Sequence, residues 1–195
     1  MVPPRADEIT PPPPPTRAPA PLPVTTLRWQ QQAEYATTAL AWLYDHDFLG
    51  SRATGAVIGL VADDTTLRLL GAVGDLPPVP RRAPVALPLD GDAPLCRAAR
   101  LGVCTCMPTP EAMRRRAPWL AAFAPAARSA ITVPIRADGR ALGSLGVTYE
   151  RELFRDGREL LARTTDLGDS LGTALRTSVT PAPPWEWIDW ERRPA

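Results

Sequence analysis

The sequence predicts an α+β domain built around an antiparallel sheet, and three patterns carry this prediction. In residues 129–150, apolar residues alternate with small or polar ones on both sides of an Asp-Gly pair, as in two strands joined by a tight turn. Residues 56–73 contain a second pair of apolar runs, separated by a short polar turn. Apolar residues with helical spacing occupy 28–44 and 157–177, on either side of the strand patterns. We therefore expect antiparallel hairpins with a long helix at each end.

The composition sets the size of the domain and separates it from two tails. Of the 195 residues, 45% are hydrophobic, which is enough for one core of ordinary size. Residues 1–24 are rich in proline, which removes amide donors and fixes φ, so we expect a disordered tail with polyproline II character. Residues 179–195 form a second tail, rich in proline and tryptophan. The globular domain is therefore expected to span residues 25–178.

The first half of the domain predicts one helix and three strands. The helix at 28–44 carries an apolar stripe that ends with two leucines three residues apart. Residues 56–62 and 66–73 are expected to pair as neighbouring antiparallel strands, because only a tight turn separates them. Residues 84–89 are expected to form a short strand at the edge of the sheet, where prolines are tolerated.

The middle of the chain predicts short helices. One begins at Pro94, with Asp92 as its capping residue, and ends at Gly102. Residues 103–106 then form a short strand. The next helix, 110–123, contains an internal proline at which it must break or kink.

The last helix carries an apolar seam with a period close to 3.5 residues, which is typical of packing between helices. A second apolar row lies beside it. One row is expected to pack on the sheet, and the other to contact a partner helix, either the helix at 28–44 or a helix of a second copy. The residues expected at a dimer contact are Leu160, Thr164, Leu167, Leu171 and Ala174.

Charge, hydropathy and cysteine content exclude several classes of function. The net charge of +1 gives no broad attraction to nucleic acid or to a membrane surface, and we find no apolar run long enough to span a bilayer. The three cysteines are odd in number and no signal peptide is visible, so we expect free thiols in the cytoplasm. The single histidine, His46, has no evident partner ligands, so no metal site is expected, and no cofactor is identified.

The predicted order of helix, two strands, small helices, hairpin and long helix over roughly residues 27–176 resembles the GAF domain of bacterial sensory proteins. The stretch PLCRAARLGVC is similar to the family's mid-domain helix, with its glycine before the next strand. The most specific features are a small residue, a strand ending in Pro-hydrophobic, a glycine-containing turn, a hydrophobic-Gly-x-hydrophobic strand, a Phe and an acidic helix start. These are Ser129, Val133-Pro134-Ile135, Asp138-Gly139, Leu142-Gly143-Ser144-Leu145, Phe154, and Asp156 with Glu159.

The resemblance implies a central antiparallel sheet of about six strands, with the terminal helices on one face. Small helices and loops would cover the other face, where family members hold small ligands. Such domains often dimerise through the terminal helices and regulate an output module, so we expect a non-catalytic sensory or regulatory module in signal transduction. We expect it to be a homodimer with an unidentified protein partner. On this placement, the expected ligand contacts are Cys96, Thr105, Trp119, Phe123, Arg128 and Ser129.

Two specialised activities of the family do not fit the chain. Bilin-binding members attach their chromophore through a cysteine beside a histidine or in related motifs, whereas His46 is far from the cysteines here. Members that bind cyclic nucleotides carry a motif with Asn and Lys, and this chain contains neither residue type. The sequence therefore names no ligand.

A thiol-dependent enzyme is the first alternative function. Cys104 and Cys106 share a face of their strand, and Cys96 is expected near them across the pocket. Free methionine sulfoxide reductases, a GAF-related family, use cysteines in this region, and Cys96 resembles one of their positions. The cysteine that they carry just before the hairpin is absent, since residues 126–128 read Ala-Ala-Arg. Buried structural thiols are the competing interpretation.

A scaffold that recruits a partner protein is the second alternative. Trp185, Trp187 and Trp190 are interleaved with acidic residues in the C-terminal tail. Three tryptophans exposed in a free tail would be unusual. They either fold back onto the domain or act as aromatic anchors for a partner.

Overall fold

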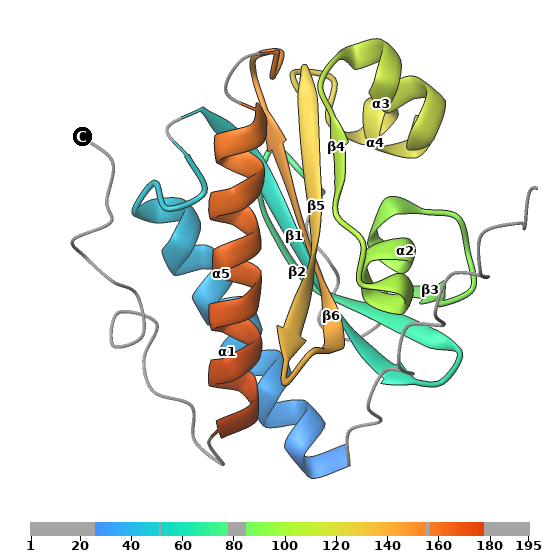
Figure 1. The fold of residues 1–195 in the computed structure, drawn as a ribbon, viewed down its shortest axis with the longest axis vertical. Helices are drawn as coiled ribbons and strands as arrows, with labels where there is room; N and C mark the ends of the chain where they lie inside the picture. Colours follow the sequence, from blue (N-terminus) through green and yellow to red (C-terminus); the bar gives the residue numbers. More distant parts are fainter. Residues whose placement is uncertain (1–25, 51, 78–84, 155–156, 178–195) are drawn as a thin grey trace, which may run out of the picture.

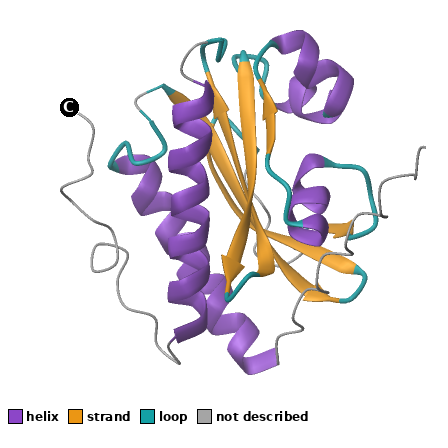
Figure 2. Cartoon of the chain, viewed as in Figure 1, coloured by secondary structure: helices purple, strands orange, loops and turns teal. Residues whose placement is uncertain are grey.

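A six-stranded antiparallel sheet forms the centre of the molecule, with helices on both of its faces (Figures 1 and 2). The structure is a computed structural model, and it describes residues 26–50, 52–77, 85–154 and 157–177. The two predicted tails lie outside the described residues. Neighbouring strands follow the order β3-β2-β1-β6-β5-β4, and every pair is antiparallel. The α+β fold class and the expected strand number are therefore confirmed.

The elements agree closely with the periodic patterns of the sequence. The long helices and the two hairpins appear where they were expected, and the proline-tolerant edge strand is present but only three residues long. No helix among the described residues has the length and apolar character needed to cross a membrane. In chain order, the elements are α1 (Thr26–Asp45), β1 (Ala53–Asp63), β2 (Thr66–Gly74), β3 (Ala86–Pro88), α2 (Pro94–Leu101), β4 (Thr105–Met107), α3 (Pro110–Arg116), α4 (Pro118–Phe123), β5 (Ser129–Ala137), β6 (Arg140–Tyr149) and α5 (Gly157–Thr177).

The β5–β6 hairpin turns at Asp138 and Gly139, which have φ values of 49° and 72°. Positive φ at both central residues suits the twist of a two-residue hairpin, and Gly adopts it without steric cost. The predicted alternation is also confirmed, because every second residue of each strand faces the core under α1 and α5. These residues are Ile131, Val133 and Ile135 on β5, and Leu145, Val147 and Tyr149 on β6.

The terminal helices α1 and α5 cover one face of the sheet (Figure 1). They lie beside each other within the chain, since the Gln32 side-chain amide donates a hydrogen bond to the Leu175 carbonyl over 2.5 Å. The α5 helix approaches β5 at backbone distance: a Cβ atom placed on Gly168 would lie 2.5 Å from the Pro134 carbonyl oxygen, and one on Gly172 would overlap the Arg136 backbone. This face is therefore closely packed.

The short helices α2, α3 and α4 cover the opposite face (Figures 1 and 2). The α2 helix is capped at its C-terminus by Gly102 in the left-handed conformation, with φ of 65°. Its N-cap is Ala93 and no side chain caps it, so the expected capping role of Asp92 is wrong. The expected break in the next helix is real, because Pro118 begins α4 directly after the end of α3.

The α5 residues predicted at a dimer contact mostly face the chain's own core. Leu160, Thr164, Leu171 and Ala174 are buried, and only Leu167 is half-buried. A helix that packs on a sheet repeats its apolar residues at nearly the same spacing as one that packs on another helix, so the sequence pattern did not separate the two partners. Dimerisation stays a prediction, and most of these five side chains are already occupied within the chain.

Candidate functional site

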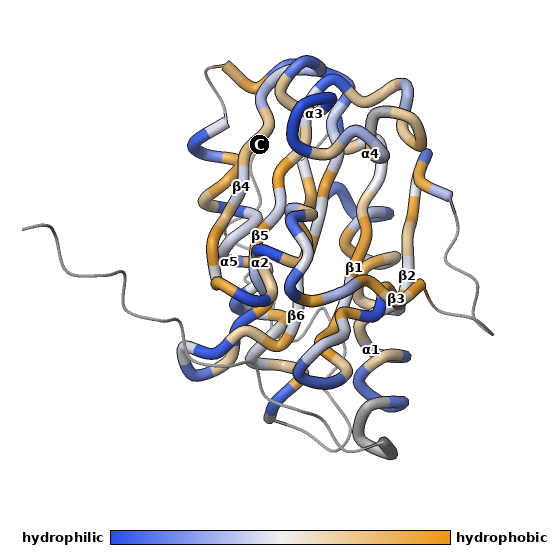
Figure 3. Tube along the Cα trace, turned by 90° about the vertical axis from the view of Figure 1, so that its right-hand side faces the viewer, coloured by the Kyte–Doolittle hydropathy of each residue, from blue (hydrophilic) through white to orange (hydrophobic). Residues whose placement is uncertain are grey.

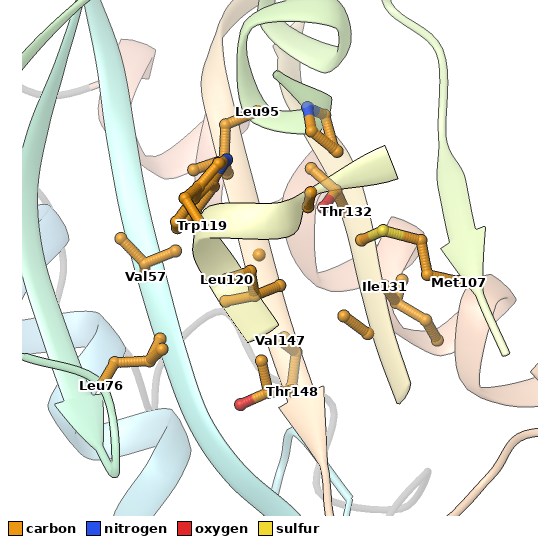
Figure 4. Close-up of a pocket in the computed structure, with 14 residues that line it drawn as sticks. Val57, Leu76, Leu95, Met107, Trp119, Leu120, Ile131, Thr132, Val147 and Thr148 are labelled. Atoms are coloured by element: carbon orange, nitrogen blue, oxygen red, sulfur yellow. The ribbon is translucent and has the colours of Figure 1, made fainter. Parts of the chain in front are cut away.

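A narrow space lies at the place where the resemblance puts a ligand, between the sheet and the helices α2 and α4. Its volume is only about 20 Å³, so it holds little more than one water molecule. Figure 4 shows Trp119 and Leu120 of α4 facing the strands across this space, with Leu95 of α2 beside Trp119. Apart from the hydroxyls of Thr132 and Thr148, the side chains in the lining are apolar. Side chains therefore fill most of the expected ligand position.

A much larger hollow lies next to this space, over strands β1, β2 and β3. Its volume is about 470 Å³, within the range of small-molecule pockets. Trp119 lines both spaces, and Phe123 lines the larger one, so α4 forms a wall that the two share. The described residues around the larger hollow are Val57, Leu69, Ala72, Leu76, Pro77, Val85, Leu87, Ala93, Trp119 and Phe123.

The two aromatic residues of α4 are unusually open to solvent for their size. Trp119 is 36% exposed and Phe123 is 56% exposed. Pro118 fixes the start of this short helix, and the preceding helix α3 ends in three arginines that keep it hydrophilic (Figure 3). The hydrophilic helix α3 is therefore followed directly by a helix with two solvent-exposed aromatic side chains.

Two of the six predicted ligand contacts line the larger hollow, and four do not line either apolar space. Trp119 and Phe123 are the two that do. Thr105 pairs with Thr132 across β4 and β5 and so shares the sheet face that lies under α2 and α4. Cys96 is buried within α2.

Arg128 and Ser129 are engaged with the segment that follows β6. The Ser129 hydroxyl donates to the Arg151 carbonyl over 2.6 Å, and the Arg128 guanidinium pairs with Glu152 at 3.0 Å. These contacts close the start of β5 onto the segment after β6. Both side chains therefore have partners within the chain, and their predicted ligand contact stays a prediction.

The cysteines lie on two sides of the sheet. Cys96 belongs to the core under α2, whereas Cys104 and Cys106 pack with the core under α5. The Cys104 sulfur is 3.6 Å from the Thr165 hydroxyl of α5. Cys104 and Cys106 share a face as expected, but the expected proximity of Cys96 to them across the pocket is wrong.

Burial disfavours the thiolate form of both Cys96 and Cys106. Burial raises the pKa of each thiol, and the nearby arginines, Arg100 for Cys96 and Arg116 for Cys106, oppose this only in part. A thiol of raised pKa is mostly protonated at neutral pH, and the thiolate is the reactive form. No cluster of His, Cys, Asp and Glu that could hold a metal ion occurs in the part of the chain that the structure describes.

A third hollow, with polar and charged side chains in its lining, lies between the β1–β2 turn, β3 and α2. It has a volume of about 590 Å³ and is lined by residues of the β1–β2 turn, by β3 and by Arg100 of α2. Charges of both signs surround it, because Asp64 and Asp90 line it together with Arg100. The Nε atom of Arg100 is buried without a hydrogen-bond partner.

Arg136 of β5 contacts helices from both faces of the sheet. One terminal nitrogen, Nη2, donates a hydrogen bond to the Gly102 carbonyl at the end of α2. The other, Nη1, lies 3.8 Å from the Asp169 carboxylate of α5. The strand β4 ends its pairing on β5 at Thr132, so the edge of β5 near Arg136 is left unpaired and the side chain can reach both helices. Nothing in the sequence pattern singled out this residue.

Comparison with known proteins supports the fold. A scan against models of protein families and a search of curated proteins both find no match. Among solved structures, the nlh2 GAF domain of A. aeolicus, crystallised in an inactive state, is similar with a TM-score of 0.56 and 16% identity, covering 76% of this chain and 92% of that one. Residues 122 to 287 of a methyl-accepting chemotaxis protein give a TM-score of 0.52 and 20% identity, covering 76% and 93%.

An enzyme shares this fold as well. The type II free methionine-R-sulfoxide reductase of Thermoplasma acidophilum is similar with a TM-score of 0.55 and 19% identity, covering 77% of this chain and 94% of that one. At these identities the similarity concerns the fold alone. The described residues therefore form a GAF-like domain, as the sequence predicted.

Proposed function

From this GAF-like fold we propose that the chain is a non-catalytic sensory or regulatory module, which binds a small molecule on the face covered by α2, α3 and α4 and passes the change to α5. Solved GAF domains with this architecture support the sensory assignment. The proposal needs a physical connection between the ligand face and the terminal helices. The contacts of Arg136 are the observation that carries it.

The guanidinium of Arg136 contacts both the C-terminal end of α2 and the middle of α5. A displacement of α2 moves the Gly102 carbonyl, and the guanidinium that it binds must then shift relative to Asp169. Burial raises the pKa of Asp169 and the charge of Arg136 opposes this, as expected for two opposite charges 3.8 Å apart. The Arg136 and Asp169 side chains are 30% and 48% exposed, so solvent screens this pair substantially and a modest coupling is expected.

The connection is tested by hydrogen exchange in a double-mutant cycle. Asp169→Asn removes the charge on α5 without touching α2. We expect it to change the exchange rates of the amides at the C-terminal end of α2, residues 101–103, by about two- to fivefold, the effect of a partly exposed ion pair. In an Arg136→Gln background, the same substitution should leave these amides unchanged.

The control uses the same change one turn earlier on the same helix. Asp166 is exposed and acts on Asp169 only through its charge, so Asp166→Asn should change the exchange rates of residues 101–103 less than Asp169→Asn does. Equal effects of Asp166→Asn and Asp169→Asn, or an effect of Asp169→Asn that persists without Arg136, would refute the connection.

The output of the module is proposed to be a change in protein contacts in the cytoplasm. A homodimer through the terminal helices and a partner bound by Trp185, Trp187 and Trp190 are the two routes that we propose. A native mass spectrum reports the number of subunits and any retained small molecule together. Deletion of residues 180–195 without loss of partner capture would remove the tail from the proposal.

A reductase function receives no support from the arrangement of the thiols. A methionine-R-sulfoxide reductase shares the fold, but fold similarity does not transfer its activity. Resolution of a sulfenic acid as a disulfide needs two cysteines within bonding reach. Cys96 lies on the opposite side of the sheet from Cys104 and Cys106. We therefore expect no thiol-dependent turnover of free methionine sulfoxide, and a rate abolished by Cys96→Ser would contradict this.

A further inference from the structure

We infer that the apolar hollow beside α4, with a volume of about 470 Å³, takes a neutral, apolar small molecule that contains a ring. This inference names the ligand class for the face on which the proposed function places binding, and it rests on that proposal for the site's regulatory role. It starts from the chemistry of the lining, the size of the hollow and the exposure of its aromatic wall.

The lining of the hollow contains no charged side chain among the described residues. All of the described side chains that border it are aliphatic or aromatic, or belong to proline. A charged group transferred into such surroundings loses its hydration without gaining an ion pair or a hydrogen bond, which is strongly unfavourable. The lining therefore selects against a carboxylate, phosphate or ammonium group on the part of the ligand that enters.

The size of the hollow suits a small molecule better than a protein. Its volume of about 470 Å³ lies well inside the range of about 300–1,000 Å³ for ligand pockets. A stable protein interface usually buries at least about 1,200 Å² in total, with a polar rim around an apolar centre. Such an interface would have to extend beyond the hollow onto neighbouring surface, and the side chains of α3 there are hydrophilic (Figure 3).

The exposed rings of α4 indicate which shape of ligand fits. Trp119 and Phe123 stand at the same wall and keep 36% and 56% of their surface exposed. Aromatic side chains interact favourably with other rings in offset-stacked or edge-to-face arrangements. A ligand with one or two rings would cover this wall and reach the strand residues Val57 and Leu69 behind it.

The contrast with the polar hollow makes the inference specific. The polar hollow offers a guanidinium, Arg100, and two carboxylates, so a charged ligand would find its partners there and not beside α4. The two hollows are neighbours, because Leu87 of β3 lines both. The same protein therefore offers an internal comparison between the binding of neutral and charged molecules.

Two fluorescent probes that share their rings and differ by one sulfonate test the inference. N-phenyl-1-naphthylamine is neutral, and 1-anilinonaphthalene-8-sulfonate carries a negative charge. We expect the neutral probe to bind the α4 hollow of the full chain at least about tenfold more tightly than the sulfonate probe does. Phe123→Ala should weaken its binding about tenfold, because a buried aromatic contact is lost.

The chain offers a matched control for this substitution. Phe154 is 72% exposed and does not line the hollow, so Phe154→Ala should leave the dissociation constant of the neutral probe within twofold. Any binding of the sulfonate probe should respond to Arg100→Gln and not to Phe123→Ala. Since Phe123 is more than half exposed, its alanine variant should keep the melting temperature of the parent, which is measured alongside.

Three results would overturn the inference. The first is equal weakening of the neutral probe by Phe123→Ala and Phe154→Ala, or no binding at all. The second is tighter binding of the sulfonate probe at Phe123. The third is a gain of more than about tenfold in affinity when residues 78–84, which join the lining residues Pro77 and Val85, are replaced by a Gly-Ser linker of equal length, because the chain itself would then be the occupant.

The outcome is separable from that of the proposed function. Binding of the neutral probe at Phe123 with no effect on the exchange of residues 160–175 supports the ligand class and removes the regulatory role. A refuted ligand class leaves the Arg136 connection intact, because its hydrogen-exchange cycle uses no ligand.

Discussion

The two faces of the sheet differ in how closely their helices approach it. On the α1–α5 face, α5 meets β5 at backbone distance through Gly168 and Gly172, and buried leucines and branched residues fill the layer between. On the other face, α2 meets β6 through side chains: a Cβ on Gly146 would lie 3.2 Å from side-chain atoms of Leu95 and Val57. The second face also holds the hollows. The comparison shows that one face is packed at backbone distance, whereas the other is packed through side chains and contains hollows.

The largest expected effect comes from adding one methyl group to α5. Gly172→Ala would place its Cβ against the Arg136 backbone, which a side-chain movement does not relieve. We expect a loss of more than about 3 kcal/mol in the free energy of unfolding, although alanine favours the helix by about 1 kcal/mol. Urea denaturation measures this loss.

The matched substitution on the other face is Gly146→Ala. It meets only side-chain atoms, which can rotate away, so we expect a loss of about 1 kcal/mol. If urea denaturation shows the same loss in the free energy of unfolding for both alanine variants, the two faces do not differ in closeness of packing.

The next largest difference is expected in the free energy of unfolding lost when one buried leucine on each face is replaced by alanine. Leu171 is fully buried between α5 and the sheet, and Leu120 is 6% exposed beside the narrow space under α4. We expect Leu171→Ala to cost about 3 kcal/mol and Leu120→Ala about 2 kcal/mol, because Leu120 already lacks neighbours on one side. Denaturation curves measured in the same buffer check the order, and a larger loss for Leu120→Ala would reverse it.

The smallest effect is a pH dependence that arises on the closely packed face. Burial raises the pKa of Tyr149 to about 12, and its hydroxyl donates to the Leu49 carbonyl over 3.1 Å. In the unfolded chain the tyrosine loses its proton near pH 10, while the folded protein keeps it up to about pH 12. The free energy of unfolding should therefore fall by about 1 kcal/mol for each pH unit between pH 10 and 12.

Tyr149→Phe isolates this contribution. The variant keeps all three cysteines, whose thiols also lose protons at alkaline pH. We expect it to flatten the fall in the free energy of unfolding between pH 10 and 12. At pH 8 we expect it to lower the free energy of unfolding by about 1 kcal/mol, because the Leu49 carbonyl loses its hydrogen bond. Unfolding followed by circular dichroism at several pH values measures both. An unchanged slope in the variant would assign the alkaline loss to other groups.

The elements of the fold were predictable from sequence because their patterns are local. The alternation around Asp138-Gly139 and the helical spacing in 157–177 depend on residues that are close in the chain. The apolar seam on α5 was predictable from its spacing, but the element that it packs against was not. Leu160 and Leu171 have the same spacing whether a sheet or a second helix covers them.

The candidate site was predictable only in part, because its residues come together from separate segments. Trp119 and Phe123 stood out as large aromatic residues on a short helix. Val57 and Leu69 look like any other core residues of a strand, and only the fold places them at a hollow. Arg136 was missed for a similar reason, since its partners on α2 and α5 lie more than thirty residues away in each direction.

The glycine contacts of α5 limit the movements that this helix can make. Rotation about its own axis would turn Gly168 and Gly172 away from β5 and bring larger side chains against the strand backbone. An ion pair between the largely exposed side chains of Arg176 and Asp138 adds a weak contact between the far end of the helix and the hairpin turn. The helix and the β5–β6 hairpin are therefore expected to tilt together as one rigid body, so a signal that reaches α5 would leave the domain as a change of helix direction and not of helix rotation.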